Sequence, residues 1–182
     1  KDSGDAGGGL RSVPGVGKNT ARGLALHVRK AETAATASLA GALAKMRFEI
    51  RYCDTCHNIS DTAECAICAN HLRDQSTVCV VSDIRDVIAI ENTAQYQGMY
   101  HVLGGVISPI EGIGPGDLNI DSMMERGTRE GSEIREVILA IRPTMEGETT
   151  AFYLSRKLRN QPELHVSNMS RGIPMGAELE YA

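Results

Sequence analysis

The sequence contains no Trp, two Phe and five Tyr, so aromatic residues make up 4% of its 182 residues. Proteins that bind single strands without sequence preference stack the bases on aromatic side chains, and such a surface is not indicated here. The chain also lacks an apolar run near the roughly 20 residues of a membrane helix. Its first residues, KDSGDAGGG, lack the apolar segment of a signal peptide. We therefore expect a cytoplasmic protein that does not associate with membranes.

The composition is otherwise that of an ordinary globular protein. Hydrophobic residues make up 42% of the chain and charged residues 23%. The length is sufficient to bury a core and suggests one domain or two small ones.

Charge is distributed unevenly along the chain. Residues 1–52 carry nine Lys and Arg against four Asp and Glu, whereas the remainder carries ten against nineteen. The formal charge is therefore +5 for the first part and −9 for the second. A basic amino-terminal module followed by an acidic body is typical of a nucleic-acid-binding arm on a protein-binding body, although halves of a protein also differ by chance.

Four of the five cysteines lie in one short stretch, CDTCHNISDTAECAIC. Each Cys-x2-Cys pair supplies two thiolates from a tight turn, and two pairs complete the tetrahedral coordination that Zn²⁺ prefers. The eight residues between the pairs are polar and can bring the two turns together. The spacing therefore predicts a zinc site made by Cys53, Cys56, Cys65 and Cys68.

Other uses of these cysteines are less favoured. Disulfides are disfavoured because the chain shows no secretion signal and the cytosol keeps thiols reduced. Redox thiols and an iron–sulfur cluster are alternatives that this spacing favours less than zinc. Four thiolates leave no coordination position open for water, so the expected single zinc ion is structural and not catalytic.

A turn followed by a helix is predicted in SVPGVGKNTARGLALHVRK, residues 12–30. Gly15 and Gly17 belong to a turn, and free backbone N–H groups at the following helix start can bind a phosphate. Lys18 and Arg22 lie one helical turn apart, where both can reach phosphates. The pattern predicts a helix-hairpin-helix that binds the DNA backbone through these four residues without reading bases. A capped core helix is the alternative.

A second helix is predicted from the stretch TASLAGALAKMRFEIRYC. Its apolar residues recur at helical spacing, which indicates a face buried in a core. They are Leu39, Ala42, Leu43, Met46 and Ile50.

From residue 77 onward, strand and helix signals alternate. Apolar strands are predicted at 78–82, 100–105, 136–141 and 163–169, and helices at 83–93, 121–131 and 146–158. This alternation predicts an α/β domain with a mainly parallel sheet. Cys79 lies inside the first strand, where we expect a small buried hydrophobe.

Acidic residues follow two of these strands. Asp83 comes after the first strand, and Glu146 and Glu148 come after the strand at 136–141. Functional groups of parallel sheets gather at the carboxyl ends of the strands, and carboxylates from such loops can bind Mg²⁺. The same residues also suit helix N-caps and first turns, or the binding of a partner. Both interpretations remain open at this stage.

The order of these modules resembles that of the bacterial recombination mediator RecR family. That family joins a helix-hairpin-helix, a four-cysteine zinc finger and a Toprim domain. Besides the cysteine cluster, the stretches that carry the resemblance are VPGVGKNTARGLALH, VCVVSDIRDVIAIE, YHVLGGVISPIEGIGPGDL, EVILAIRPTMEGETTAFYL and RGIPMGAELEYA. Together they cover almost all of residues 12–182.

The resemblance implies a division of the chain into four parts. Residues 1–52 would form the helix-hairpin-helix module, 53–76 the zinc finger and 77–171 the Toprim domain. Residues 172–182 would begin a carboxy-terminal oligomerisation segment. In the family this segment continues and takes part in ring closure, so we expect it to be truncated here.

The resemblance also implies a function in recombinational DNA repair without catalysis, and hence no catalytic residues. Members of the family form a ring-shaped tetramer that can encircle DNA, so a homo-oligomer, either a ring tetramer or a dimer, is expected. They act with RecO, and in some settings RecF, to load the recombinase onto single-stranded DNA. By this resemblance, Asp83, Glu146 and Glu148 would be vestigial Toprim acids or bind the RecO-type partner.

Some positions differ from the family pattern. Asn19 and Gly23 stand where the family usually carries basic residues, and Lys18 and Arg22 each come one residue earlier, which is about 100° around a helix. Ser82 replaces an acid that many members carry.

Two further functions remain as alternatives. One is a Toprim-type Mg²⁺-dependent nuclease or primase-like enzyme that uses Asp83, Glu146 and Glu148. The other is a zinc-bearing interaction module whose acidic face binds protein and does not contact DNA.

Overall fold

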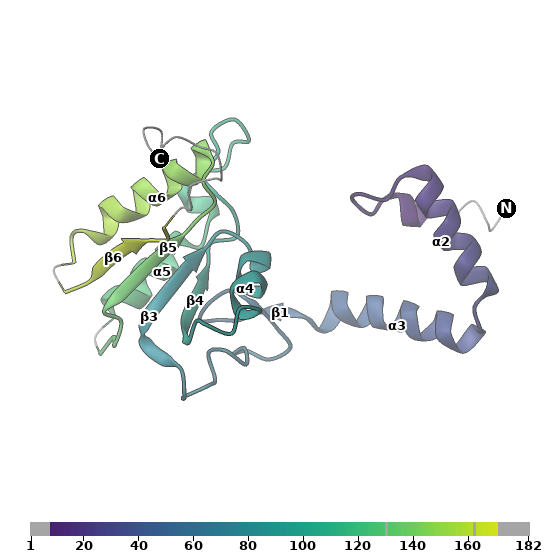
Figure 1. The fold of residues 1–182 in the computed structure, drawn as a ribbon, viewed down its shortest axis with the longest axis horizontal. Coiled ribbons are helices and arrows are strands. Elements are labelled where there is room, and N and C mark those ends of the chain that lie inside the picture. Colours follow the sequence, from purple (N-terminus) through teal and green to yellow (C-terminus); the bar gives the residue numbers. More distant parts are fainter. Residues whose placement is uncertain (1–7, 130, 162, 171–182) are drawn as a thin grey trace. The chain divides into compact units, whose positions relative to one another are not determined.

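The computed structural model describes residues 8–129, 131–161 and 163–170, and the chain divides into two compact units, Lys1–Ile50 and Arg51–Ala182. Figure 1 shows helices in the first unit and a sheet with helices in the second.

The first unit contains two longer helices, α2 (Lys18–Lys30) and α3 (Thr33–Glu49), after a single helical turn at residues 8–11. Helix α2 ends where the Ala31 N–H donates to the carbonyls of His27 and Val28. The α3 sequence is rich in Ala, which has the highest helix propensity.

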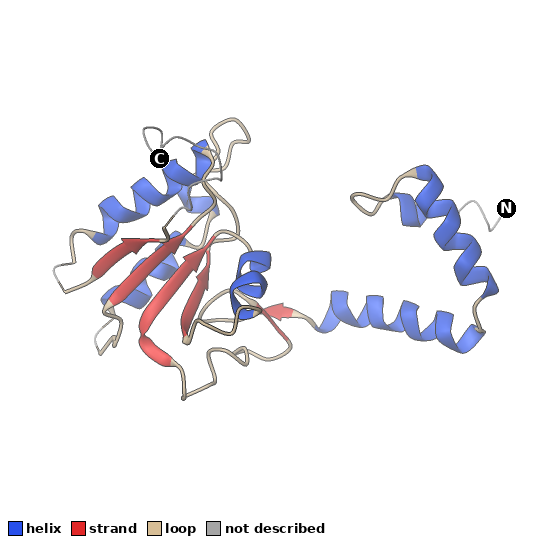
Figure 2. Ribbon diagram, viewed as in Figure 1, coloured by secondary structure: helices blue, strands red, loops and turns tan. Residues whose placement is uncertain are grey.

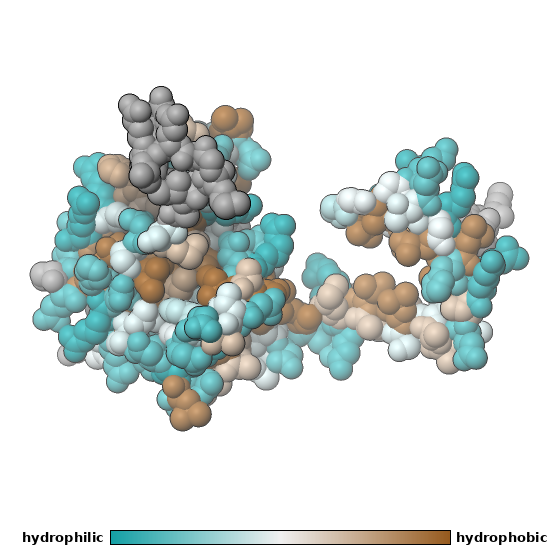
Figure 3. Space-filling view, viewed as in Figure 1, coloured by the Kyte–Doolittle hydropathy of each residue, from teal (hydrophilic) through white to brown (hydrophobic). Residues whose placement is uncertain are grey.

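The expectation that the apolar residues of α3 form a core was wrong for the single chain. Helix α3 has no buried residue, and Leu39, Leu43 and Met46 are each more than half exposed. The apolar side chains along α3 lie on the surface in Figure 3. The prediction of a helix was correct, but the described part of this unit supplies no second layer to cover its apolar residues. The spacing of apolar residues in a sequence does not show what covers them.

The second unit begins with a two-stranded antiparallel sheet, β1 (Arg51–Tyr52) and β2 (Ile59–Ser60), which brackets the first pair of cysteines. A four-stranded sheet follows. Its strands are β3 (Asp74–Val81), β4 (Gly98–Val102), β5 (Glu136–Ala140) and β6 (His165–Asn168). They pair in parallel in the order β4-β3-β5-β6 (Figure 2), which confirms the predicted parallel α/β fold.

Helices cover both faces of this sheet because alternate strand residues point to opposite sides. Val87 of α4 (Ile84–Glu91) packs with Cys79 and Val81 of β3 on one face. On the other face, α5 (Ile120–Thr128) and α6 (Met145–Leu158) pack against Val78 and Val80. The short helix η1 (Pro115–Asp117) precedes α5. Cys79 is 4% exposed, which confirms that it is a core residue.

The strand order places a topological switch between β3 and β5. The chain leaves β3 toward β4 on one side of the sheet, whereas β5 and β6 lie on the other side of β3. Loops that follow β3 and β5 therefore emerge at the same edge, where α/β proteins commonly bind ligands.

Candidate metal centre and nucleic-acid interface

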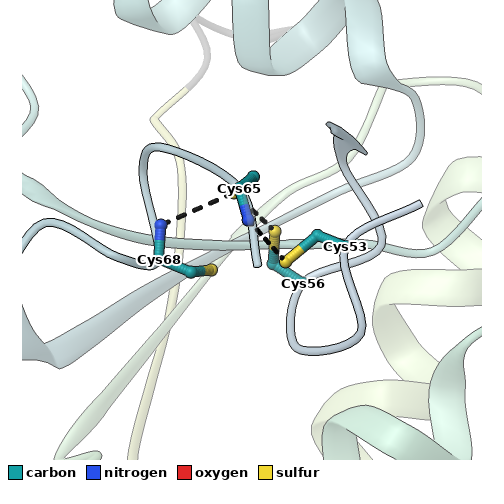
Figure 4. A group of neighbouring side chains, drawn as sticks. All are labelled: Cys53, Cys56, Cys65 and Cys68. Atoms are coloured by element: carbon teal, nitrogen blue, oxygen red, sulfur yellow. Dashed lines mark hydrogen bonds between the residues drawn. The ribbon is translucent and has the colours of Figure 1, made fainter. Parts of the chain in front are cut away.

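The four cysteines predicted to bind zinc are brought together in the second unit. Their sulfur atoms all lie within 4.8 Å of one another, and all four residues are buried. Figure 4 shows the side chains converging from two turns, with the Cys65 N–H donating to the Cys53 sulfur over 3.3 Å. A tetrahedron with Zn–S bonds near 2.3 Å has sulfur–sulfur distances of about 3.8 Å, so the group fits zinc.

The protonation of these thiols also favours a bound dication. A hydrogen bond from Cys68 lowers the pKa of Cys56 to about 5, whereas burial raises the pKa of Cys65 to about 11. The pKa of Cys68 is raised because its thiol donates that hydrogen bond to Cys56. Cys56 is therefore readily a thiolate, whereas Cys65 and Cys68 resist the loss of their protons. Zinc binding supplies the missing positive charge and displaces the remaining protons.

The zinc finger is joined to the edge strand of the large sheet. The Val102 N–H of β4 donates to the carbonyl of Cys56 over 2.8 Å. At the same edge, Arg126 of α5 donates to the Tyr100 carbonyl and Arg73 donates to the Gly98 carbonyl. Open edges of sheets invite pairing with other strands. The zinc finger and two arginines thus occupy hydrogen-bonding groups that β4 would otherwise expose.

A second connection runs through His57, next to the zinc ligand Cys56. His57 has a φ of 59°, which turns its side chain out of the cysteine turn, and its Nε2 lies 2.8 Å from the Ser122 hydroxyl of α5. The Ser122 hydroxyl in turn donates to the Asn119 carbonyl over 3.1 Å. This chain of hydrogen bonds ties the zinc finger to the start of α5.

His101 lies beneath this connection in the middle of β4. It is fully buried, and its Nε2 donates to the Asn119 carbonyl over 2.7 Å. Among the described residues, none forms a hydrogen bond with its Nδ1. Burial lowers the pKa of His101 to about 3, so the imidazole is neutral at physiological pH. Its ring meets the His57 ring edge-on at 5.2 Å between centroids.

A partly buried ion pair fixes the chain that leaves the zinc finger. Arg73 donates two hydrogen bonds to the Glu91 carboxylate of α4, and the Tyr100 hydroxyl donates to the same carboxylate over 2.7 Å. Glu91 is thus part of a partly buried ion pair, whereas a solvated helix position is what its sequence context alone suggests. No local signal pairs Arg73 with Glu91, because the two come together only in the tertiary structure.

The predicted acidic residues lie at the switch edge, as expected from the strand order. Asp83 is the N-cap of α4 and accepts hydrogen bonds from the backbone and the guanidinium of Arg85. These bonds lower the pKa of Asp83 to about 2. Glu146 and Glu148 lie in the first turn of α6, whose N-cap is Thr144. The geometry is that of helix-capping acids.

This acidic edge also contains a cation. Arg142, which follows β5, lies with its Nε 3.4 Å from the Ser82 hydroxyl at the end of β3. Ser82 donates to Asp86 over 2.9 Å. In the part of the chain that the structure describes, the four cysteines are the only group of three or more Cys, His, Asp or Glu residues placed to share a metal ion.

The predicted DNA-binding residues lie at the start of α2 in the first unit. Gly15 has a φ of +82°, a conformation that favours glycine, and Gly17 is the N-cap of α2 without a side-chain hydrogen bond to the helix start. Lys18 and Arg22 are exposed on the helix. The structure therefore contains the turn and the basic helix start, and their contact with DNA stays a prediction.

Comparison with known proteins supports the assignment of the zinc finger and of the Toprim domain. Residues 50–70 match the family model described as the RecR zinc finger domain with four cysteine ligands, and residues 76–169 match the Toprim domain. Proteins named recombination protein RecR are similar over nearly the whole chain. That of Cytophaga hutchinsonii is 55% identical over 94% of this chain and 83% of its own length, and that of Phocaeicola vulgatus is 53% identical over 96% and 83%. That of Porphyromonas gingivalis is 56% identical over 94% and 81%.

The fold and the cysteine site thus define a protein that joins a four-cysteine zinc finger to a Toprim domain, and its similarity to the RecR proteins makes it a protein of DNA recombination and repair. The chain belongs to the RecR family. It is accordingly a recombination mediator and not an enzyme, although it carries a Toprim domain. The predicted structural zinc and the predicted Toprim domain are confirmed. Within the described residues, the structure has no helix that is both long and apolar enough to span a membrane.

We expect Cys65→Ser to abolish stoichiometric zinc binding and to unfold the region around residues 53–68, because a lost thiolate removes much of the folding free energy that zinc supplies. Elemental analysis for zinc and hydrogen exchange of these residues measure the effect. Cys79→Ser is the matched control, since Cys79 lies outside the cluster and this variant should keep one zinc ion. Full zinc content and unchanged exchange in Cys65→Ser would contradict the structural role.

We expect His101 to make stability depend on pH. Its folded-state pKa of about 3 lies below its ordinary value of 6.5, so between these values the unfolded chain binds a proton that the folded chain excludes. Stability therefore rises with pH in this window and is lost as the pH falls. From pH 6.5 to 5, the wild type should lose about 1.5 kcal/mol more than His101→Gln.

Urea unfolding at each pH, with zinc content measured in parallel, tests this expectation. His71→Gln is the control, because it makes the same substitution at an exposed histidine outside the core. Equal pH dependence in the wild type and His101→Gln would show that His101 does not cause it.

Proposed function

We propose that this protein binds DNA through its amino-terminal unit and acts with a RecO-type protein, and in some settings a RecF-type protein, to load the recombinase onto single-stranded DNA. The contacts to DNA are assigned to Gly15, Gly17, Lys18 and Arg22. The observation that carries the proposal is the uncapped, positively charged start of α2, which follows the Gly15 turn and has no acidic residue in its first turn. Membership in the RecR family supports it.

The charge distribution supports DNA binding by the first unit and protein binding by the second. The first unit carries eight Lys and Arg against four Asp and Glu, a formal charge of +4, and the second carries eleven against nineteen, a formal charge of −8. A basic unit suits the phosphate backbone, and an acidic body suits a basic protein partner. We assign partner binding to Asp83, Glu146 and Glu148 at the switch edge. Asp83 caps α4, and Glu146 and Glu148 lie in the first turn of α6, so the helix starts carry the three acids at this edge.

Self-association is part of the proposal. The exposed apolar face of α3 includes Leu39, Leu43 and Met46, which are 52%, 56% and 56% exposed. Contiguous apolar surface of this kind marks interaction sites in soluble proteins. We propose that a second copy of the chain covers it in a dimer or a ring tetramer that works in the cytoplasm on DNA. Residues 172–182, assigned to an oligomerisation segment, lie outside the described residues.

We expect the double variant Lys18→Ala/Arg22→Ala to weaken DNA binding with a reduced dependence on salt. Each lost phosphate contact lowers the slope of log affinity against log salt by about 0.9 on duplex DNA and about 0.7 on single strands. Fluorescence anisotropy over a series of salt concentrations measures the slope. Lys45→Ala is the control, because Lys45 pairs with Glu49 on α3. Unchanged binding by the double variant would exclude this interface and favour a module that binds protein alone.

We expect Glu146→Gln/Glu148→Gln to weaken the complex with the cognate RecO protein at least tenfold while leaving DNA binding unchanged. The physical reason is the loss of two fixed negative charges at the proposed contact. Isothermal titration calorimetry measures the affinity. The control Glu133→Gln/Glu163→Gln removes the same charge from two exposed positions outside this edge. Equal affinity for RecO in both double variants would remove the acids from the interface.

A further inference from the structure

Helix α2 carries basic residues near both of its ends. Its sequence, KNTARGLALHVRK, contains four Lys and Arg residues and no Asp or Glu. These are Lys18, Arg22, Arg29 and Lys30, and all four are exposed. The helix therefore presents positive charge well beyond its first turn.

Three of these cations form a column parallel to the helix axis. At about 100° per residue, Arg22 and Arg29 lie within about 40° of Lys18 around the helix. Eleven residues separate Lys18 from Arg29, which corresponds to about 16 Å along the axis. Lys30 lies about 100° away from Arg29 and so points from a different side of the helix.

The surroundings leave this column open. Helix α2 packs through another side, where Ala21 is 1% exposed and Val28 is half-buried. The ion pairs formed among the described residues involve none of the column cations. Three uncompensated cations in one line cost electrostatic repulsion that an extended polyanion would relieve.

The spacing suits the sugar–phosphate backbone of a nucleic acid. One strand of a nucleic acid carries a continuous row of negatively charged phosphates, so a column of about 16 Å is long enough to contact more than one of them. Only the first two cations belong to the DNA contact assigned above. The column continues past them for about 10 Å, because seven residues separate Arg22 from Arg29.

We propose that the DNA backbone runs lengthwise along the Lys18–Arg22–Arg29 column, and that Arg29 is a further phosphate contact. This inference rests on the proposed function of α2 in DNA binding and extends it from the helix start to the whole helix. If DNA met only the first turn of α2, Arg29 would lie about three turns away and would contribute little through screened charge.

The test compares two neighbouring residues of the same helix in the full-length protein. Arg29→Gln and Lys30→Gln each remove one positive charge from the last turn of α2, so their effects on net charge and helix stability are matched. Anisotropy with a fluorescent DNA duplex is recorded over a series of KCl concentrations. Circular dichroism confirms that both variants are folded.

The proposal expects Arg29→Gln to lower the salt slope by about 0.9 per contacting protomer and the affinity at 0.1 M salt about eightfold. Lys30→Gln should leave the slope nearly unchanged, and Arg29→Lys should retain most of the wild-type slope because it keeps the charge. Equal effects of Arg29→Gln and Lys30→Gln on the salt slope and the affinity would overturn the proposal that DNA runs along the column.

The outcome for Arg29 is separable from that of the wider proposal. If Lys18→Ala/Arg22→Ala weakens binding and Arg29→Gln does not differ from Lys30→Gln, the helix start binds DNA and the lengthwise path is wrong. If none of these variants changes binding, α2 is not the DNA-binding element at all.

Discussion

Coordination of one zinc ion by four thiolates is the interaction on which the second unit of this protein depends. The loops that carry the cysteines have little regular structure, since β1 and β2 contain two residues each. Zinc binding holds these loops in one conformation, and in that conformation the Cys56 carbonyl accepts a hydrogen bond from Val102 of the large sheet. The metal thus acts beyond the finger, because it positions a backbone group that covers the edge of β4.

The large sheet forms because its strands are apolar. Polar interactions then occupy the edges of the sheet. Arg73 and Glu91 form a partly buried ion pair with side-chain exposures of 12% and 29%. Such pairs contribute specificity more than net stability, because desolvation offsets much of the attraction. At the carboxyl edge, Arg85 and Arg142 lie beside Asp83. At this edge α/β folds commonly bind ligands, and here the negative charge of Asp83 is already partly neutralised by the two arginines.

Much of the architecture could be predicted from the sequence, because it depends on local patterns. The two Cys-x2-Cys pairs predicted the zinc site, and alternating apolar segments predicted the parallel sheet. The strands β1 and β2 could not be predicted, since two residues carry no periodicity. The contact between His57 and Ser122 was equally inaccessible, because 65 residues separate them in the chain. Helix α3 was predicted correctly, but the assignment of its apolar residues to a core was wrong.

The sequence by itself determined the identity of the metal ligands, the type of fold and the charge of each unit. These properties depend on residue type and on spacing within one short segment, which the linear chain contains in full. Only the tertiary structure decided which groups meet across long separations, such as Arg73 with Glu91 and Cys56 with Val102. It also decided that α3 keeps its apolar face exposed within the single chain. Burial is a property of the surroundings of a residue, and those surroundings exist only once the chain has folded.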